Sequence, residues 1–208
     1  MLLLNPGPVR LTERVRRSLL QPDLCHRESE FFDLQDEARQ RLLDVHGLDA
    51  AVWTATLITA SGTAAVESMI ASLVPAEGRL LVVENGVYGD RITQICAQYG
   101  IAHERVSGDW MRAPDWDVVA AALDRGSFSH AALVHHETTT GRLNDLAALA
   151  EVCRTRGVGL LADCVSSFGA EEIEFANASL KAVAGTANKC LHGVPRSSCK
   201  RASRPRSR

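Results

Sequence analysis

Residues 159–189 read GLLADCVSSFGAEEIEFANASLKAVAGTANK, and this segment indicates the architecture most clearly. Its first five residues form a short apolar run that ends on Asp163. Residues 182–184 form a second, shorter run before a polar loop that contains Lys189. A continuous apolar run without alternation is typical of a strand that is buried on both faces. The segment therefore predicts two inner strands of a parallel sheet, each followed by polar residues.

The same pattern extends through the rest of the chain. Further strands are predicted at residues 80–84 and 131–135, and the mostly apolar residues 55–58 precede another polar loop. Helical segments alternate with these runs, at residues 12–20, 30–45, 63–73, 90–99, 115–123 and 144–156. Apolar strands that alternate with helices predict an α/β fold, in which helices flank a mostly parallel sheet on both faces.

Length and composition predict a folded, soluble domain. Of the 208 residues, 46% are hydrophobic and 23% are charged, which is too apolar for a disordered chain. No apolar run approaches the roughly 20 residues that a membrane-spanning helix needs, and no signal peptide is recognised. The net charge of −2 predicts no nucleic-acid or membrane partner. The six cysteines include no CxxC pair and are expected to be reduced, in a cytoplasmic protein.

Small and polar residues follow the predicted strands, at the edge where such sheets bind ligands. Ser61, Gly62 and Thr63 open a helix, whose free N–H groups could hold a phosphate, although Ser61 taken alone reads better as an ordinary N-cap. Taken alone, Asp163 also fits a loop cap, and a lone lysine such as Lys189 is nearly always solvated. Together, these groups are the set that pyridoxal phosphate chemistry uses.

In that chemistry a lysine amine forms a Schiff base with the cofactor, and an acid keeps the pyridine nitrogen protonated. Tyr88, on another strand-end loop, could stack on the cofactor ring. His135 and His136 are adjacent on a strand and point to opposite faces, so we expect structural hydrogen bonds and no metal site. No GxGxxG or P-loop pattern occurs, which leaves a dinucleotide or P-loop site without support.

Several motifs resemble those of the class V, fold-type I aminotransferases, which use pyridoxal 5′-phosphate. TANKCLHGVP at residues 186–195 is similar to the segment that carries the Schiff-base lysine of this family. The other matching motifs are LNPGPV (4–9), ASGTAAVESM (60–69), ENGVYGDR (84–91), HHETTTGRLN (135–144) and ADCVSSFGAE (162–171). They occur in the family's order and near its spacing, so the resemblance covers residues 1–195.

The resemblance implies a role for each matched residue. Lys189 would be the catalytic residue, which forms the Schiff base and then moves the substrate proton. Asp163 would pair with the pyridinium nitrogen, and Tyr88 would stack on the ring. The other implied contacts are phosphate binding by Ser61, Gly62 and Thr63 with help from Asn188, a hydrogen bond from Thr138 to the ring oxygen, and a place near the substrate entrance for Asn5, Pro6 and Gly7.

The motifs are most similar to those of family members that transfer the amino group of 2-aminoethylphosphonate to pyruvate. That reaction gives phosphonoacetaldehyde and alanine, and it is the reaction the resemblance implies. Two alternatives remain open. One is an alanine–glyoxylate or serine–pyruvate type transaminase of the same fold, and the other is an inert fragment that at most binds the cofactor. The resemblance also implies a homodimer for the full-length family.

The resemblance stops at Pro195, where the family continues with a glycine and an apolar strand. Residues 196–208 instead read RSSCKRASRPRSR, with six of the 23 lysines and arginines and none of the 25 acids. We therefore expect an N-terminal segment plus an incomplete cofactor-binding large domain at 1–195, and a basic non-family tail at 196–208. A reading-frame change explains this tail better than a nucleic-acid-binding role does.

In the family, the strand that follows the lysine enters the interior of the sheet, antiparallel to its neighbours. A small C-terminal domain and the partner subunit then supply further substrate and phosphate contacts. We expect this chain to stop before that domain and to lack the interior strand. Two inner strands would then have unpaired backbone groups, which predicts a chain that is largely insoluble or molten and inactive.

Overall fold

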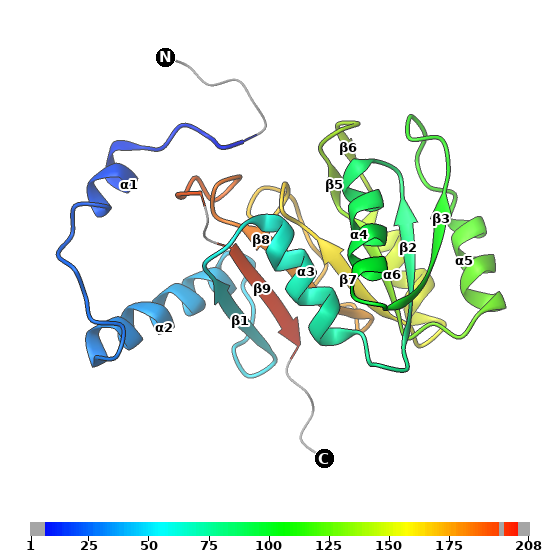
Figure 1. The fold of residues 1–208 in the computed structure, drawn as a ribbon, viewed down its shortest axis with the longest axis horizontal. Helices are drawn as coiled ribbons and strands as arrows, with labels where there is room; N and C mark the ends of the chain where they lie inside the picture. Colours follow the sequence, from blue (N-terminus) through cyan, green and yellow to red (C-terminus); the bar gives the residue numbers. More distant parts are fainter. Residues whose placement is uncertain (1–6, 196–197, 204–208) are drawn as a thin grey trace.

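A computed structural model of the chain describes residues 7–195 and the backbone of residues 198–203. The main sheet consists of β1 (Trp53–Ile58), β2 (Arg79–Glu84), β3 (Ala102–Ser107), β4 (His130–Val134), β7 (Gly159–Asp163), β8 (Leu180–Thr186) and β9 (Ser198–Ser203). Their order is β1-β9-β8-β7-β4-β2-β3 (Figure 1). From β8 to β3 the strands run parallel, so the mostly parallel sheet predicted from the sequence is confirmed. Two short strands, β5 (His136–Glu137) and β6 (Arg142–Leu143), form a separate antiparallel pair.

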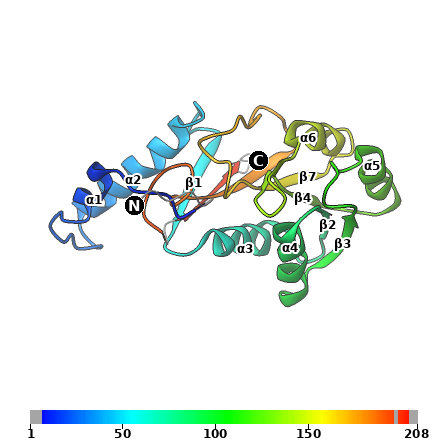
Figure 2. The same cartoon turned by 90° about the horizontal axis from the view of Figure 1, so that it is seen from above.

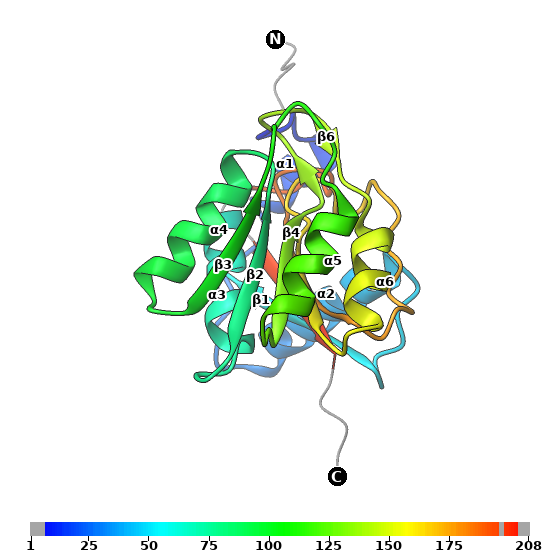
Figure 3. The same ribbon diagram turned by 90° about the vertical axis from the view of Figure 1, so that its right-hand side faces the viewer.

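Helices cover both faces of the sheet. They are α2 (Ser29–Asp44), α3 (Gly62–Leu73), α4 (Val87–Gln98), α5 (Trp116–Arg125) and α6 (Leu146–Arg154), whereas α1 (Glu13–Ser18) lies in an arm away from the sheet (Figure 1). Figure 2 shows α3 and α4 on one face and α2, α5 and α6 on the other, and Figure 3 shows the same layers from the side. In the described part of the chain, no helix is long and apolar enough to cross a membrane.

The inner strands are apolar at successive positions because they separate two hydrophobic cores. In β2, Leu80 and Val82 belong to the core beneath α3 and α4. Leu81 and Val83 alternate with them and belong to the core beneath α5 and α6. Both faces of the strand are buried, so neither set of positions tolerates polar residues.

The predicted elements are present, with small shifts at their ends. α4 begins at Val87, three residues before the predicted start at residue 90, which places Tyr88 inside its first turn. Side-chain caps mark several helix starts: Thr12, Ser61, Asp115 and Asp145 each accept an N–H from the following turn. β3 was not predicted, because this edge strand reads AHERVS and is only half-buried.

The expectation of a missing interior strand is wrong. β9 lies between β1 and β8 and is antiparallel to both, with six residue pairs to β1 and five to β8. Its sequence, SCKRAS, carries no apolar run and gave no sign of a strand. Backbone pairing does not depend on side-chain type, so this segment can supply the partners that β1 and β8 need. Residues 196–197 and 204–208 of the expected tail lie outside the described residues.

We expect the pairing of β9 to be necessary for folding. A chain shortened to residues 1–195 should lose cooperative unfolding in urea, since each unpaired buried backbone group costs about 1–3 kcal/mol and native domains hold only about 5–15 kcal/mol. A chain of residues 1–203 is the matched control and should unfold like the full chain. Equal midpoints for residues 1–195 and 1–203 would contradict the pairing.

Candidate active site

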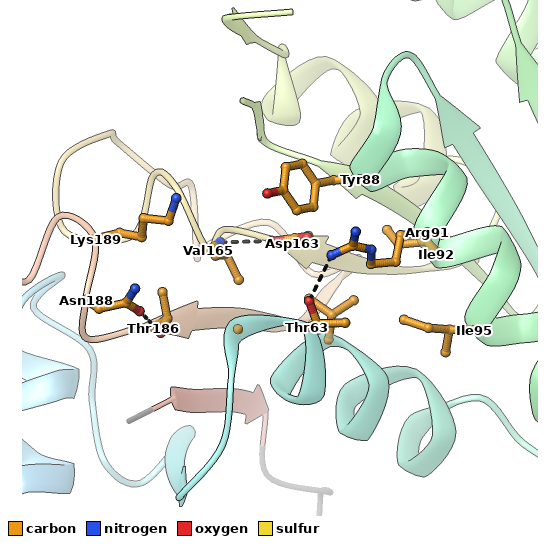
Figure 4. A pocket seen from close by; sticks show the side chains of 12 residues that line it. Thr63, Tyr88, Arg91, Ile92, Ile95, Asp163, Val165, Thr186, Asn188 and Lys189 are labelled. Atoms are coloured by element: carbon orange, nitrogen blue, oxygen red, sulfur yellow. Dashed lines mark hydrogen bonds between the residues drawn. The ribbon is translucent and has the colours of Figure 1, made fainter. Parts of the chain in front are cut away.

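Loops at one edge of the sheet enclose a cavity of about 150 Å³. It lies beyond the carboxyl ends of β7 and β8, between the first turn of α3 and the side of α4 (Figure 4). Its polar lining residues are Thr63, Tyr88, Arg91, Asp163, Thr186, Asn188 and Lys189, and the others are Gly62, Val66, Ile92, Ile95 and Val165. Segments far apart in the sequence therefore meet at the edge where a parallel sheet binds ligands.

The start of α3 forms one wall of this cavity. Ser61 is the N-cap, and its Oγ accepts the N–H of Ala64 at 3.3 Å. Gly62 lies so close to the loop after β7 that a Cβ at this position would be 2.9 Å from Cγ1 of Val165. Gly62 and Thr63 line the cavity, whereas the Ser61 hydroxyl serves the helix. The first N–H groups of a helix have no acceptor within it and favour an anion.

Asp163 is the last residue of β7 and is 6% exposed. Its Oδ1 accepts the N–H of Val165 at 2.9 Å. Burial raises the pKa of Asp163 to about 6, although the Val165 N–H opposes the change. The charge of Glu137 raises this pKa further, and the charges of Arg91 and Lys189 lower it. A buried carboxyl with a shifted pKa beside a cavity is typical of a functional site.

Lys189 lies in the turn after β8 and lines the cavity on the side away from α4 (Figure 4). Its neighbour Asn188 also lines the cavity, and its Oδ1 accepts a hydrogen bond from the Thr186 hydroxyl at 2.7 Å. Lys181, by contrast, is near the amino end of β8, where its Nζ donates to the carbonyl of Ala178. The two lysines of this region therefore differ in surroundings, and Lys189 is the one at the cavity.

Gly7 packs directly against the side chain of Lys189. A Cβ at this position would lie 2.5 Å from the Lys189 Cδ, and the φ of +154° also favours glycine. Gly7 therefore lies next to the lysine that lines the cavity, and its place near a substrate entrance, which the resemblance implied, stays a prediction. Asn5 and Pro6, which the same prediction included, lie outside the described residues.

Tyr88 lines the main cavity, whereas Thr138 does not. Tyr88 lines it from α4, and Figure 4 shows the ring above Asp163 and Val165. Thr138 lines a smaller adjoining cavity of about 10 Å³, together with Tyr88 and Asp163. Its Oγ1 lies 2.8 Å from Oγ of Ser166. Thr138 is therefore near the carboxyl of Asp163 but separate from the main cavity.

The adjacent histidines make structural hydrogen bonds. His135 Nδ1 lies 3.0 Å from Oγ of Ser167, and His136 Nδ1 lies 3.3 Å from the carbonyl oxygen of Ser166. Burial lowers the pKa of His135. Among residues 7–195, no group of three or more histidine, cysteine or acidic side chains is arranged to hold a metal ion.

Sequence analysis did not identify Glu137, which is fully buried behind the cavity. Its Oε2 accepts the N–H groups of Tyr88 and Gly89 at 3.1 and 3.2 Å. Its Oε1 accepts the N–H and the hydroxyl of Thr139 at 3.2 and 2.7 Å. A Cβ at Gly86 would lie 2.2 Å from the Glu137 Cδ, so the carboxylate fits tightly against the start of α4. Glu137 therefore fixes the turn that carries Tyr88.

Arg91 is the second residue that sequence analysis did not identify. It lies on α4, and its Nη1 donates to Oγ1 of Thr63 at 3.2 Å. Its guanidinium carbon is 5.1 Å from the centre of the Tyr88 ring. An arginine on an amphipathic helix is usually solvated, so Arg91 was not a candidate site residue. The one sequence signal for it was its place at the end of the motif ENGVYGDR.

Comparisons with known proteins agree on one family. The family model described as "Aminotransferase class-V" matches residues 17–195. The 2-aminoethylphosphonate–pyruvate transaminases of Vibrio vulnificus (strain YJ016) and Bacillus cytotoxicus are 39% and 36% identical over 93% of the chain. The chain spans about half the length of these curated relatives, 53% in both. The structure of an alanine–glyoxylate aminotransferase from Nostoc sp. is similar with a TM-score of 0.89 and 28% identity, over 100% of this chain and 56% of that one.

The shifted pKa of Asp163 predicts that its ionisation destabilises the protein when no cofactor is bound. The folded-state pKa of about 6 lies above that of an unfolded aspartate. Stability therefore falls as pH rises from about 4 to about 6, by about 3 kcal/mol in total. Asp163→Asn in cofactor-free protein should be more stable than the parent at pH 7.5, and this difference should vanish at pH 4. Urea unfolding at both pH values measures it.

Asp124→Asn is the matched control for this prediction. Asp124 is exposed and paired with Arg156, whose hydrogen bond lowers the pKa of this carboxyl. Its replacement should give no gain in stability at pH 7.5. An Asp163→Asn protein that is no more stable than the parent at pH 7.5 would show that burial does not oppose the charge.

Proposed function

The chain belongs to the class-V aminotransferase family, whose cofactor is pyridoxal 5′-phosphate, and we propose that its cavity binds this cofactor. The observation that carries the proposal is the meeting of four kinds of group on one cavity (Figure 4). They are the amine of Lys189, the carboxyl of Asp163, the ring of Tyr88 and the first turn of α3. These groups match the aldehyde, pyridine nitrogen, ring face and phosphate of the cofactor.

Each residue then has a defined task. The bound cofactor supplies a ring that accepts electrons from a substrate carbon. Lys189 would hold the cofactor covalently through Nζ until the amino group of the substrate displaces it, and the freed amine would then move a proton to and from the substrate carbon. Asp163 keeps a proton on the ring nitrogen, and Tyr88 packs on the ring face. The remaining contacts of the proposal are the ring oxygen with Thr138 and the phosphate with Ser61, Gly62, Thr63 and Asn188.

The proposed reaction is transfer of the amino group of 2-aminoethylphosphonate to pyruvate. The relatives that carry this name support it, because they match nearly the whole chain at more than a third identity. Transfer between alanine and glyoxylate is the second candidate. It is favoured by the structural similarity to the Nostoc enzyme, which extends over the whole chain.

We also propose a homodimer in the cytoplasm. The arm that contains α1 and leads into α2 exposes large apolar residues to solvent, including Leu20 at 83% and Leu19 at 60%. Exposed apolar residues in such an arm are typical of a surface that binds another chain. Cys25, Cys96, Cys153 and Cys190 carry thiols that form no disulfide, which fits a reducing compartment.

The cofactor assignment predicts covalent labelling of Lys189. Borohydride reduction of the protein with pyridoxal phosphate should fix a pyridoxyl group on the peptide that contains Lys189, as detected by mass spectrometry. Lys189→Ala should abolish this label, and Lys181→Ala should retain it, because Lys181 is directed to the Ala178 carbonyl away from the cavity. A label found mainly on Lys181 or Lys200 would contradict the assignment.

The substrate assignment predicts alanine formation from 2-aminoethylphosphonate and pyruvate. The parent protein should form alanine faster than it forms glycine from alanine and glyoxylate, and Lys189→Ala should form neither. Asp163→Asn should lose the activity, because an unprotonated pyridine ring accepts electrons poorly. Asp90→Asn on the side of α4 should retain it, since the Asp90 carboxylate accepts a hydrogen bond from Gln94 of the same helix and does not line the cavity.

Two outcomes would decide against this substrate. Glycine formation without any alanine from 2-aminoethylphosphonate would favour the alanine–glyoxylate reaction. Labelling of Lys189 without turnover of either pair would favour a chain that binds the cofactor but is catalytically inert.

A further inference from the structure

Arg91 is a cation directed into the cavity rather than into solvent. Figure 4 shows its guanidinium between the start of α3 and Asp163. Other arginines pair with carboxylates on the surface: Arg154 with Glu151, and Arg156 with Asp124. Within residues 7–195, no carboxylate lies within 4.0 Å of the Arg91 guanidinium nitrogens.

The hydrogen bond from Arg91 to Thr63 places this charge beside the first turn of α3. The distance from Nη1 to the Thr63 hydroxyl is 3.2 Å. Thr63 lies directly after Gly62, whose close approach to Val165 holds the turn against the cavity. An anion that accepts the first N–H groups of α3 therefore comes within reach of the guanidinium. A guanidinium presents several N–H donors in one plane, which suits the oxygens of a phosphate.

We propose that Arg91 binds the phosphate of the cofactor together with the first turn of α3, an inference that rests on the proposed function. Arg91 supplies the compensating charge, and the Thr63 hydroxyl and the helix N–H groups supply neutral donors. The guanidinium also lies 5.1 Å from the Tyr88 ring centre, so one side chain links the ring position to the phosphate position.

The experiment must distinguish this phosphate contact from an effect of Arg91 on the cofactor ring. Arg91 could act on the ring alone, by holding Tyr88 or by stabilising the charge of Asp163. In that case its loss would weaken the binding of any pyridoxal compound. A phosphate contact instead predicts a loss that is confined to ligands with a phosphate group.

The test compares pyridoxal phosphate with pyridoxal, which lacks the phosphate. Arg91→Gln should weaken pyridoxal phosphate binding by about 10- to 100-fold, the range that corresponds to one charged hydrogen bond or two. Its affinity for pyridoxal should equal that of the parent. Arg91→Lys keeps the charge without the planar donors, so its affinity for pyridoxal phosphate should lie between those of the parent and Arg91→Gln. Arg112→Gln, at a side chain that is 84% exposed, is the matched control and should bind both ligands normally.

Inorganic phosphate gives a second readout that does not depend on the cofactor. It should raise the thermal midpoint of the cofactor-free parent and of Arg112→Gln, and it should raise that of Arg91→Gln much less. Circular dichroism of each variant checks that the fold is retained, and Arg91→Lys serves if Arg91→Gln does not fold.

The possible results distinguish the phosphate contact of Arg91 from the cofactor site itself. Equal loss for pyridoxal phosphate and pyridoxal would overturn the phosphate assignment and leave the cofactor site intact. No loss for either ligand would overturn any role of Arg91 in binding. A parent protein that binds neither ligand would overturn the proposed function, and the Arg91 assignment with it.

Discussion

β7 and β8 pair in parallel with Asp163 beside Ala184, so the carboxyl of Asp163 and the turn with Lys189 leave the sheet at the same edge. Leu161 of β7 and Ala184 of β8 are fully buried in the core beneath α3 and α4. A shift of one residue in this pairing would turn such side chains to the opposite face. The apolar core therefore fixes the distance between acid and lysine, and it holds the start of α3 against the same edge.

The two helix starts at this edge are used differently. Glu137 occupies the start of α4, where its carboxylate accepts the N–H groups of Tyr88 and Gly89. The start of α3 has a neutral cap, Ser61, and lines the cavity with Gly62. At α4 the carboxylate of Glu137 already interacts with the helix dipole, whereas the dipole of α3 remains available to an anion from outside the chain. This difference supports the proposal that the cofactor phosphate binds at α3.

Much of this arrangement was predictable from the sequence, and the exceptions have physical reasons. The inner strands read as apolar runs because both of their faces are buried, and the pairing of Asp163 with a later lysine followed from strand ends alone. The stacking of Tyr88 on the cofactor ring was inferred first from its strand-end loop, the contact of Thr138 with the ring oxygen came from the family resemblance, and both stay predictions. Glu137 was missed because a buried carboxylate departs from the usual correlation between polarity and exposure, and β9 was missed because its sequence contains no apolar run.

β9 connects the stability of the sheet to the site. α3 packs across both β8 and β9, so the helix whose first turn borders the cavity rests partly on this strand. β8, which pairs with β9 along one edge, carries the turn with Lys189 at its end. What the sheet requires at this position is a backbone partner, and the backbone of residues 198–203 supplies it although the sequence there contains lysine, arginine and serine. The pairing of β8 with β9 therefore positions both the first turn of α3, which contains Thr63, and the turn that contains Lys189.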